Sequence, residues 1–391
     1  MIRVFGVVVE PVINRRQWKQ FLGLPWAIYQ DDPFWIPPLR RNQEELVGYR
    51  RHPFYDQAES QAFLAYRNGE PCGRVLALIN RAHNLRHEES RGFFGFFESR
   101  DDSEVAAALF ESVKNWLSQR GVEAIRGPTN PSLNYECGLL VEGFDSSPTF
   151  MMTYNPPYYG RLIEENGFQK VQDLYAYWGH VDMVGSLDKK LQFVIDEAKR
   201  RFDVKLRRLD RSRFRTEVRM FLDIYNQSLG GTWGFVPLSD AEIDHMSSGM
   251  RHLIVPEMTS VAEVDGRPVA AIFGLLDYNP RIREIDGRLF PLGFLRLLNR
   301  RKSLQTVRLI STNVIPEFQR WGIGLVVLNR LLPDILDWGI QEVEFSWVLE
   351  SNHLSRATLE RGGAIRTKTY RLYDYEFESE VVDQQPVTED A

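Results

Sequence analysis

The sequence is poor in cysteine, and its two cysteines stand far apart. Cys72 and Cys137 are the whole complement of a 391-residue chain, and they form no Cys-x-x-Cys pair. Disulfide frameworks and thiolate zinc sites both need clustered cysteines, so neither is indicated. Such sparse use fits a reducing compartment, and we expect the protein to be cytoplasmic.

A net positive charge is missing as well, because the formal net charge is -5. Nucleic-acid binding requires a basic face that displaces condensed counterions, so we expect no nucleic-acid partner. Short basic runs do occur, around Arg200, around Arg211 and from Arg296 to Lys302. We interpret them as solvated helix faces and loops.

The chain also lacks a long hydrophobic run. Its apolar start, residues 1–9, reaches Glu10 too soon to cross a bilayer, and it has no charged leader or small-residue cleavage site. This start predicts a first strand, and we expect no membrane partner.

No metal site is predicted. His83 and His87 have the i, i+4 spacing of zinc ligands, but no glutamate stands between them. We interpret both histidines as solvated.

What the sequence does contain is one order of elements, used twice. Hydrophobic residues make up 43% and charged residues 26%, as in globular proteins, and the length exceeds a single core. Each half begins with a β-hairpin whose turn is of a primed type, Asn68-Gly69 in one and Asp265-Gly266 in the other. A strand, a helix, a strand, a helix and a last strand then follow, at about 92–97, 103–119, 122–125, 158–166 and 170–178 in the first half and 307–314, 322–338, 342–349, 353–361 and 365–377 in the second.

This repetition predicts two domains of similar build. We place them at residues 1–185 and 204–378, joined by a linker helix at 186–203 and followed by a short acidic tail at 379–391. The stretch from Asn279 to Ser303, rich in Pro, Gly and Arg, has no counterpart in the first half and is interpreted as an insertion.

A glycine-containing loop, residues 319–324, stands between the strand at 307–314 and the next helix. Pyrophosphate needs converging backbone N–H donors, and a helix N-terminus supplies them with the positive end of its dipole. Gly322 and Gly324 keep side chains away from such donors, while Gln319 and Arg320 add a donor and a charge. The third glycine of the dinucleotide fingerprint and the Gly-Lys-Ser/Thr of Walker A are both absent.

The helix after the loop has one apolar stripe, which we expect to pack on a sheet although Pro333 interrupts it. The stripe consists of Leu325, Leu328, Leu332 and Ile335.

A Gln-x-x-Gly-x-Gly loop in this setting resembles that of the GNAT superfamily of acyl-CoA-dependent acyltransferases. The resemblance implies an α+β (mixed α/β) fold of two GNAT-like domains, each a mixed, mostly antiparallel sheet flanked by helices, and it implies acetyl-CoA or another acyl-CoA as cofactor. The residues that it marks as cofactor-binding are Val314, Gln319, Arg320, Trp321, Gly322, Ile323, Gly324 and Asn352. The matching turn of the first half, Glu98 to Glu104, has several carboxylates and no glycine, so we interpret this half as a degenerate copy without CoA, its helix capped by Asp102 or Ser103.

Acyl transfer to an amine needs a general base and a proton donor for the thiolate. Glu344 and Glu350 are the candidate bases. Side chains alternate between the two faces of a strand, however, so Glu344 facing solvent remains an alternative. Many GNAT members have a tyrosine as the acid where this chain has Leu359. Tyr370 of the last strand is the candidate that takes its place, with Tyr373 and Tyr375 as alternatives that half-buried packing would also explain.

The leading hypothesis is an acyl-CoA-dependent N-acyltransferase that acts on an unidentified small-molecule or peptide amine. We expect two loops of the first half, 127–135 and 151–159, to shape the acceptor pocket. An aminoacyl or peptidyl transferase of the tandem GNAT-like type and a non-catalytic acyl-CoA sensor remain the alternatives.

Overall fold

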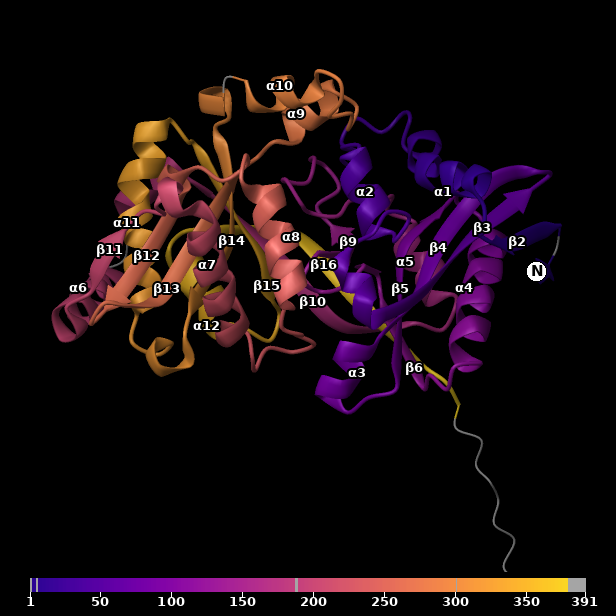
Figure 1. The fold of residues 1–391 in the computed structure, drawn as a ribbon, viewed down its shortest axis with the longest axis horizontal. Helices are drawn as coiled ribbons and strands as arrows, with labels where there is room; N and C mark the ends of the chain where they lie inside the picture. Colours follow the sequence, from indigo (N-terminus) through magenta and orange to yellow (C-terminus); the bar gives the residue numbers. More distant parts are fainter. Residues whose placement is uncertain (1, 5, 187–188, 300, 379–391) are drawn as a thin grey trace, which may run out of the picture.

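The computed structural model describes residues 2–4, 6–186, 189–299 and 301–378. The predicted acidic tail and Arg300 of the basic run lie outside these residues. In Figure 1 the N-terminal half, coloured indigo to magenta, and the C-terminal half, coloured orange to yellow, form the two ends of an elongated molecule.

The N-terminal half is a sheet covered by α4. Asn68 and Gly69 have φ angles of 53° and 82°, which confirms the primed turn of the hairpin. Asp102 caps α4 by accepting hydrogen bonds from the backbone of Glu104 and Val105. The elements are β1 (Ile2–Val4), β2 (Val7–Pro11), α1 (Arg15–Ile28), α2 (Arg40–Leu46), β3 (Ala58–Arg67), β4 (Glu70–Asn80), α3 (Arg81–His87), β5 (Arg91–Ser99), α4 (Ser103–Ser118), β6 (Ala124–Gly127), β7 (Thr129–Asn130), β8 (Glu136–Cys137), β9 (Leu139–Glu142), α5 (Tyr159–Glu164) and β10 (Gln169–His180).

The apolar start of the chain forms two strands instead of the single one predicted. β1 and β2 pair antiparallel with each other. Gly6 lies between them with a φ of 81°, a left-handed conformation that favours glycine and turns the chain back.

The C-terminal half repeats this order and adds an insertion. Asp265 and Gly266, with φ angles of 50° and 76°, confirm the second primed turn. The elements are α6 (Lys189–Phe202), β11 (Lys205–Arg207), α7 (Phe214–Ser228), α8 (Asp240–Met250), β12 (Thr259–Val264), β13 (Arg267–Leu276), α9 (Asn279–Glu284), α10 (Gly293–Leu298), β14 (Thr306–Val314), α11 (Ile323–Trp338), β15 (Glu342–Leu349), α12 (His353–Arg361) and β16 (Ile365–Glu376). Helix α11 runs through Pro333 unbroken, contrary to the expectation, because buried neighbours such as Leu331 and Ile335 hold both sides of the proline in place.

The two half-sheets join into one 14-stranded sheet by exchanging their last strands. Strand β16 of the C-terminal half pairs antiparallel with β6, while β10 of the N-terminal half pairs antiparallel with β15. Figure 1 shows the yellow β16 reaching into the N-terminal half. The centre of the molecule is therefore built from both halves, and the division at 1–185 and 204–378 stays a prediction.

Strands β14 and β15 run parallel but separate partway along. Their pairing extends from Thr306 opposite Glu342 to Leu309 opposite Phe345. At that level β14 also shifts its register against β13, between Leu309 and Ser311, and then stays paired with β13 to its end. The two strands therefore diverge, and the sheet has a gap between them at the level of Leu309.

Candidate active site

The loop at 319–324 lies where β14 leads into α11. The backbone N–H groups of Ile323 and Gly324 have no acceptor among the described residues, and they stand at the positive end of the helix dipole. A Cβ atom added to Gly324 would lie 3.3 Å from Cγ2 of Thr312, so the glycine keeps this approach open. Arg320 is exposed nearby. The free amides and the guanidinium fit the predicted pyrophosphate cradle.

Three of the predicted cofactor residues are engaged by the protein itself. The side-chain amide of Gln319 donates to the carbonyl oxygens of Ser228 and Val314, at 3.0 and 3.1 Å. The N–H of Val314 donates to the hydroxyl of Ser228. Asn352 caps α12 by accepting a hydrogen bond from the N–H of Ser355. Gln319 and Val314 therefore fix the loop to the end of its strand, and Asn352 begins the helix across the groove described below.

The linker helix α6 packs directly against the loop. A Cβ atom on Gly322 would lie 2.5 Å from Cγ1 of Val194, so glycine is required here for helix packing and for a φ of 77°. The guanidinium of Arg201 lies 3.9 Å above the ring of Trp321. The linker helix thus sets the position of the loop.

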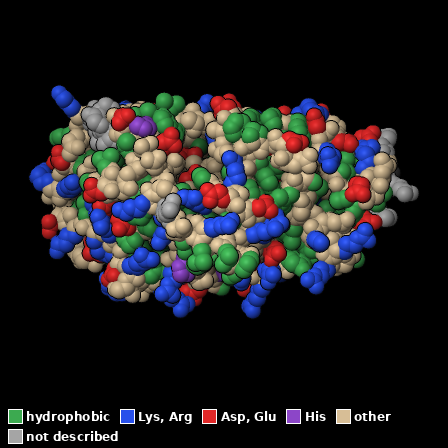
Figure 2. Space-filling view, turned by 90° about the horizontal axis from the view of Figure 1, so that it is seen from above, with side chains coloured by type: hydrophobic (Ala, Val, Ile, Leu, Met, Phe, Trp, Pro, Cys, Tyr) green, Lys and Arg blue, Asp and Glu red, His purple; other side chains and the backbone are tan. Residues whose placement is uncertain are grey.

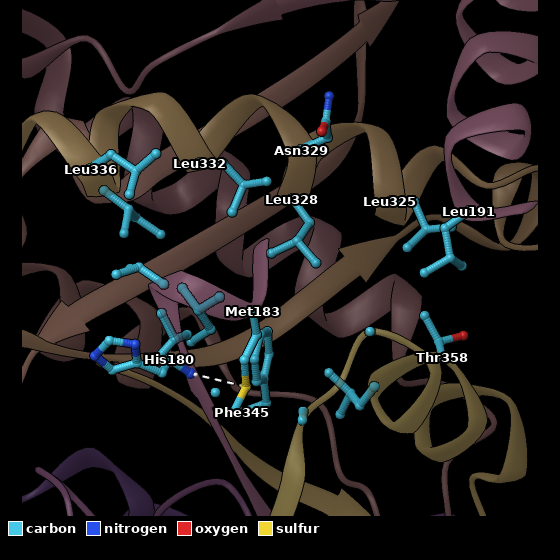
Figure 3. A pocket seen from close by; sticks show the side chains of 18 of the residues that line it. His180, Met183, Leu191, Leu325, Leu328, Asn329, Leu332, Leu336, Phe345 and Thr358 are labelled. Carbon is cyan, nitrogen blue, oxygen red and sulfur yellow. Dashed lines mark hydrogen bonds between the residues drawn. The ribbon is translucent and has the colours of Figure 1, made fainter. Parts of the chain in front are cut away.

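An apolar groove lies between α11 and α12 and over β15 (Figure 3). It contains about 940 Å³ of space outside the protein atoms, part of it open to solvent. Leu359, at the position of the missing tyrosine, is one of its walls. The lining side chains include Met183, Leu191, Leu325, Leu328, Leu332, Leu336, Phe345 and Leu359.

The groove corrects the predicted role of the apolar stripe on α11. Leu325, Leu328 and Leu332 are only partly buried and face the groove, as Figure 3 shows, and Ile335 also lines it. A different face of the helix packs on the sheet, with Ile323, Val326, Val327 and Leu331 as its buried residues. Helix α11 therefore has two apolar faces, which a single stripe does not reveal.

The opposite side of the same strands holds a buried charge. Alternation along β15 puts Phe345 in the groove and Glu344 and Ser346 on the other face. There Nε of Arg308 donates to the Ser346 hydroxyl at 2.8 Å, and Nη2 donates to the Ser346 carbonyl at 3.1 Å. Glu344 accepts a hydrogen bond from the same hydroxyl and is only 5% exposed, so the solvent-facing alternative for Glu344 is wrong.

The N-terminal half closes over Arg308, Ser346 and Glu344, which we call the Arg308 cluster together with the side chains around them. Nη1 of Arg308 donates to the carbonyl oxygens of Phe150 and Met151, at 3.1 and 3.2 Å. The hydroxyl of Thr149 donates to Glu344. The loop that leads into the stretch at 151–159 therefore forms one wall of the cluster.

Two carboxyl groups that the sequence did not point to lie close to Arg308. Burial raises the pKa of Glu136 to about 7, against the opposing charge of Arg308. Burial also raises the pKa of Asp277 to about 7, although the N–H groups of Asn279 and Phe150 donate to its carboxylate at 3.1 and 3.0 Å. The Glu136 carboxyl, by contrast, has no hydrogen-bond partner within the described part of the chain. It is thus the carboxyl of this cluster that is free to exchange a proton.

Tyr370 is the one of the three candidate tyrosines that belongs to this cluster. Its hydroxyl is fully buried and has no hydrogen-bond partner among the described residues. Burial, and next the charge of Glu344, raise its pKa well above the usual value, so the phenol keeps its proton. The hydroxyl of Tyr373 instead donates to Glu164 at 3.2 Å, and Tyr375 packs against Phe168.

The second candidate base has other partners. The carboxylate of Glu350 pairs with Lys170 at 3.0 Å and accepts a hydrogen bond from the hydroxyl of Tyr175. Within the described ranges its partners all come from β10, and none of them belongs to the Arg308 cluster. The structure therefore brings Glu344 and Tyr370 together and leaves Glu350 outside.

One histidine of the predicted pair differs from the expectation. His83 is buried, and burial lowers its pKa to about 4, so it is not solvated. It packs edge-on against the ring of Phe93 and lies 3.3 Å from a carboxylate oxygen of Glu89. No group of three or more His, Cys, Asp or Glu side chains able to hold a metal occurs in the part of the chain that the structure describes.

Comparisons with known proteins agree with this architecture. No protein-family model matches the chain. A tandem GNAT protein from the clavulanic acid biosynthesis pathway has a similar fold, with a TM-score of 0.56 at 10% identity over 95% of this chain and 99% of that one. The GCN5-related N-acetyltransferase from Sphaerobacter thermophilus is also similar, with a TM-score of 0.53 at 13% identity over 95% and 96% of the two chains. The fold is thus the α+β tandem fold of GNAT acyltransferases.

Two relatives match at the level of sequence. Protein YghO of Escherichia coli (strain K12) is 35% identical over 374 residues, which cover 94% of this chain and 95% of that protein. The bacterial ceramide synthase of Caulobacter vibrioides (strain NA1000 / CB15N) is 34% identical over 376 residues, which cover 94% and 96%. The chain belongs to the family of these two proteins.

Proposed function

We propose that the protein is an acyl-CoA-dependent N-acyltransferase that joins a long-chain acyl group to the amine of a long-chain lipid base. The observation that carries this proposal is the gap between β14 and β15, with the apolar groove on one side and the Arg308 cluster on the other. The name of the relative from Caulobacter, a bacterial ceramide synthase, supports the substrate class, because a ceramide is an amide between a fatty acid and a long-chain base.

The groove side suits an acyl-CoA. In this proposal the free amides of Ile323 and Gly324, with Arg320, hold the pyrophosphate. The groove walls, among them Leu328 and Phe345, enclose the apolar chain and exclude water. When bound, acyl-CoA supplies an activated thioester.

The cluster side suits the amine. Glu136 takes a proton from the ammonium group of the base, which frees the nitrogen lone pair for attack on the thioester carbon. As the carbon–nitrogen bond forms and the carbon–sulfur bond breaks, the buried phenol of Tyr370 gives its proton to the departing thiolate and takes up the second proton that the nitrogen loses, which restores the phenol. The products are an amide and a free thiol, and Glu136 returns its proton to the solvent. Arg308 keeps Ser346 and Glu344 in place throughout.

The proposal is tested with the purified full-length protein, palmitoyl-CoA and sphinganine. We expect mass spectrometry to find the N-acyl product and a thiol assay to find free CoA in equal amounts. Thiol release without amide would make the protein a thioesterase. Binding without turnover would favour the sensor, and activity with peptide amines in place of sphinganine would favour a peptide-directed transferase, so each of these results contradicts the proposal.

A further inference from the structure

The insertion between β13 and β14 exposes apolar side chains. Phe290, Leu292 and Leu295 are 70%, 61% and 60% exposed. Together with Phe294 they account for four of the twelve large hydrophobic side chains that are exposed among the described residues. Four such side chains within six positions form a patch and not the usual scatter of single exposed residues.

The same segment is strongly basic in an acidic protein. Residues 279–303 contain seven Arg or Lys and two Asp or Glu, a formal charge of +5 in a chain whose total is -5. Arg288 and Arg296 flank the apolar side chains and are exposed. Figure 2 looks down on this side of the molecule and shows hydrophobic side chains interspersed with Lys and Arg. We call Arg288, Phe290, Leu292, Leu295 and Arg296 the insertion face.

The insertion is held firmly above the junction of the two halves, at the top of Figure 1. The Asn279 side chain donates to the carbonyl of Pro148 at 2.7 Å, in the loop that leads to the wall of the Arg308 cluster. The N–H of Arg40 donates to the carbonyl of Gly287 at 3.0 Å. The insertion is thereby fixed to the loop that forms one wall of the Arg308 cluster.

We propose that the insertion face docks the protein on the surface of a bilayer that contains anionic phospholipids. Its apolar side chains protrude from a short helix and its preceding turn, as is suited to entry into a fluid interface, and its guanidinium groups match headgroup phosphates. No helix within the described residues combines the length and the apolar character required to cross a bilayer. This inference goes beyond the proposed reaction, and it departs from the sequence-based expectation of no membrane partner.

The experiment is co-sedimentation of the full-length protein with vesicles of phosphatidylcholine, alone or mixed with phosphatidylglycerol. We expect binding to the mixed vesicles that weakens as salt is added, because salt screens the charges. The double variant Arg288→Gln, Arg296→Gln should bind them less, by about fivefold for each charge removed. The triple variant Phe290→Ser, Leu292→Ser, Leu295→Ser should lose binding, since its apolar anchor is gone.

Matched controls lie elsewhere on the surface. Leu85→Ser removes a leucine that is 85% exposed on α3, and Arg215→Gln removes an arginine whose side chain is 80% exposed on α7. Both should bind vesicles like the wild type, and all variants should keep the wild-type melting temperature. Wild-type protein that stays in the supernatant with anionic vesicles overturns the proposal. Variants of the insertion face that bind vesicles as well as the controls overturn it too. A wild-type protein that is a dimer, and that the triple variant converts to a monomer, also overturns it, because the insertion face would then bind a second copy of the chain. Vesicle binding needs no catalysis, so its failure is distinct from failure of the acyl-transfer assay.

Discussion

Replacing Glu136 by glutamine should make the protein more stable and less active at the same time. The pKa of this carboxyl is raised from its usual 4.5 to about 7 by burial. A raised folded-state pKa means that stability is complete below pH 4.5, falls as the pH rises to about 7, and stays low above that, because the unfolded chain ionises the group more easily. Glutamine has the same shape and carries no charge at any pH.

The size of the effect follows from the shift. A displacement of this size corresponds to about 3 kcal/mol. The Glu136 side chain is only partly buried, so screening by solvent reduces the expected difference in stability to about 2 kcal/mol. Glu136→Gln should therefore be more stable than the wild type by about 2 kcal/mol at pH 8 and equal to it at pH 4. Urea denaturation at the two pH values measures this difference.

The activity of the same variant tests the role of the base. Wild-type kcat/KM should rise with pH through about 7 as the Glu136 carboxylate forms. In Glu136→Gln we expect this rise to vanish and kcat to fall by about 10² to 10⁴. Asp277→Asn is the matched control, since the pKa of Asp277 is also raised to about 7 but its carboxylate is held by two backbone N–H groups. A rise through pH 7 that survives in Glu136→Gln and disappears in Asp277→Asn would refute the assignment.

Three further substitutions address the cradle, the groove and the acid. Gly324→Ala should still bind acyl-CoA in calorimetry, because its Cβ would come no closer than 3.3 Å to its neighbours, at the methyl group of Thr312. Gly324→Glu should abolish binding, because it adds bulk and negative charge where the pyrophosphate lies. If both variants bind acyl-CoA as tightly as the wild type, the loop is not part of the site. Leu332→Trp should fill the groove and lower kcat/KM for palmitoyl-CoA by about tenfold or more while acetyl-CoA is little affected, and a uniform loss for both donors would count against an acyl-chain groove. Tyr370→Phe removes a buried hydroxyl without a partner, so the melting temperature should hold or rise while kcat falls by about 10² and KM stays constant; unchanged kcat would leave Tyr370 a packing residue.

The parts of the fold that depend on local chemistry could be predicted from the sequence. Asn68-Gly69 and Asp265-Gly266 take φ > 0 in primed turns, and Asp102 caps its helix through its own side chain. These signals lie within a few residues of the structure that they determine. The loop at 319–324 belongs to the same class, because a glycine-containing helix start is a local feature.

The exchange of β10 and β16 could not be predicted in this way. The hydrophobic pattern of each strand allows it to pair with the sheet of its own half or with that of the other half. The outcome depends on pairing between residues more than a hundred positions apart. The burial of Glu344 stayed open in the sequence for the same reason, because the Thr149 hydroxyl that binds it comes from the other half.

One signal for the buried cluster was present in the sequence. Arg308 stands between Val307 and Leu309, in a run of residues that is otherwise typical of a buried strand. A charged side chain in that position needs hydrogen-bond or ion-pair partners inside the protein. Glu136 gave no such signal, because its strand β8 is only two residues long and shows no periodic pattern, and only the folded chain brings it to Arg308.

The most direct test of the proposed acyl transfer is a crystal structure of the protein with a non-hydrolysable palmitoyl-CoA analogue. We expect the pyrophosphate on the backbone N–H groups of Ile323 and Gly324 and the acyl chain along Leu328 and Leu332. We expect the thioester position at the gap between β14 and β15, within reach of Tyr370 and Glu136. An analogue bound in the N-terminal half, or one whose thioester position lies away from that gap, would contradict the proposal.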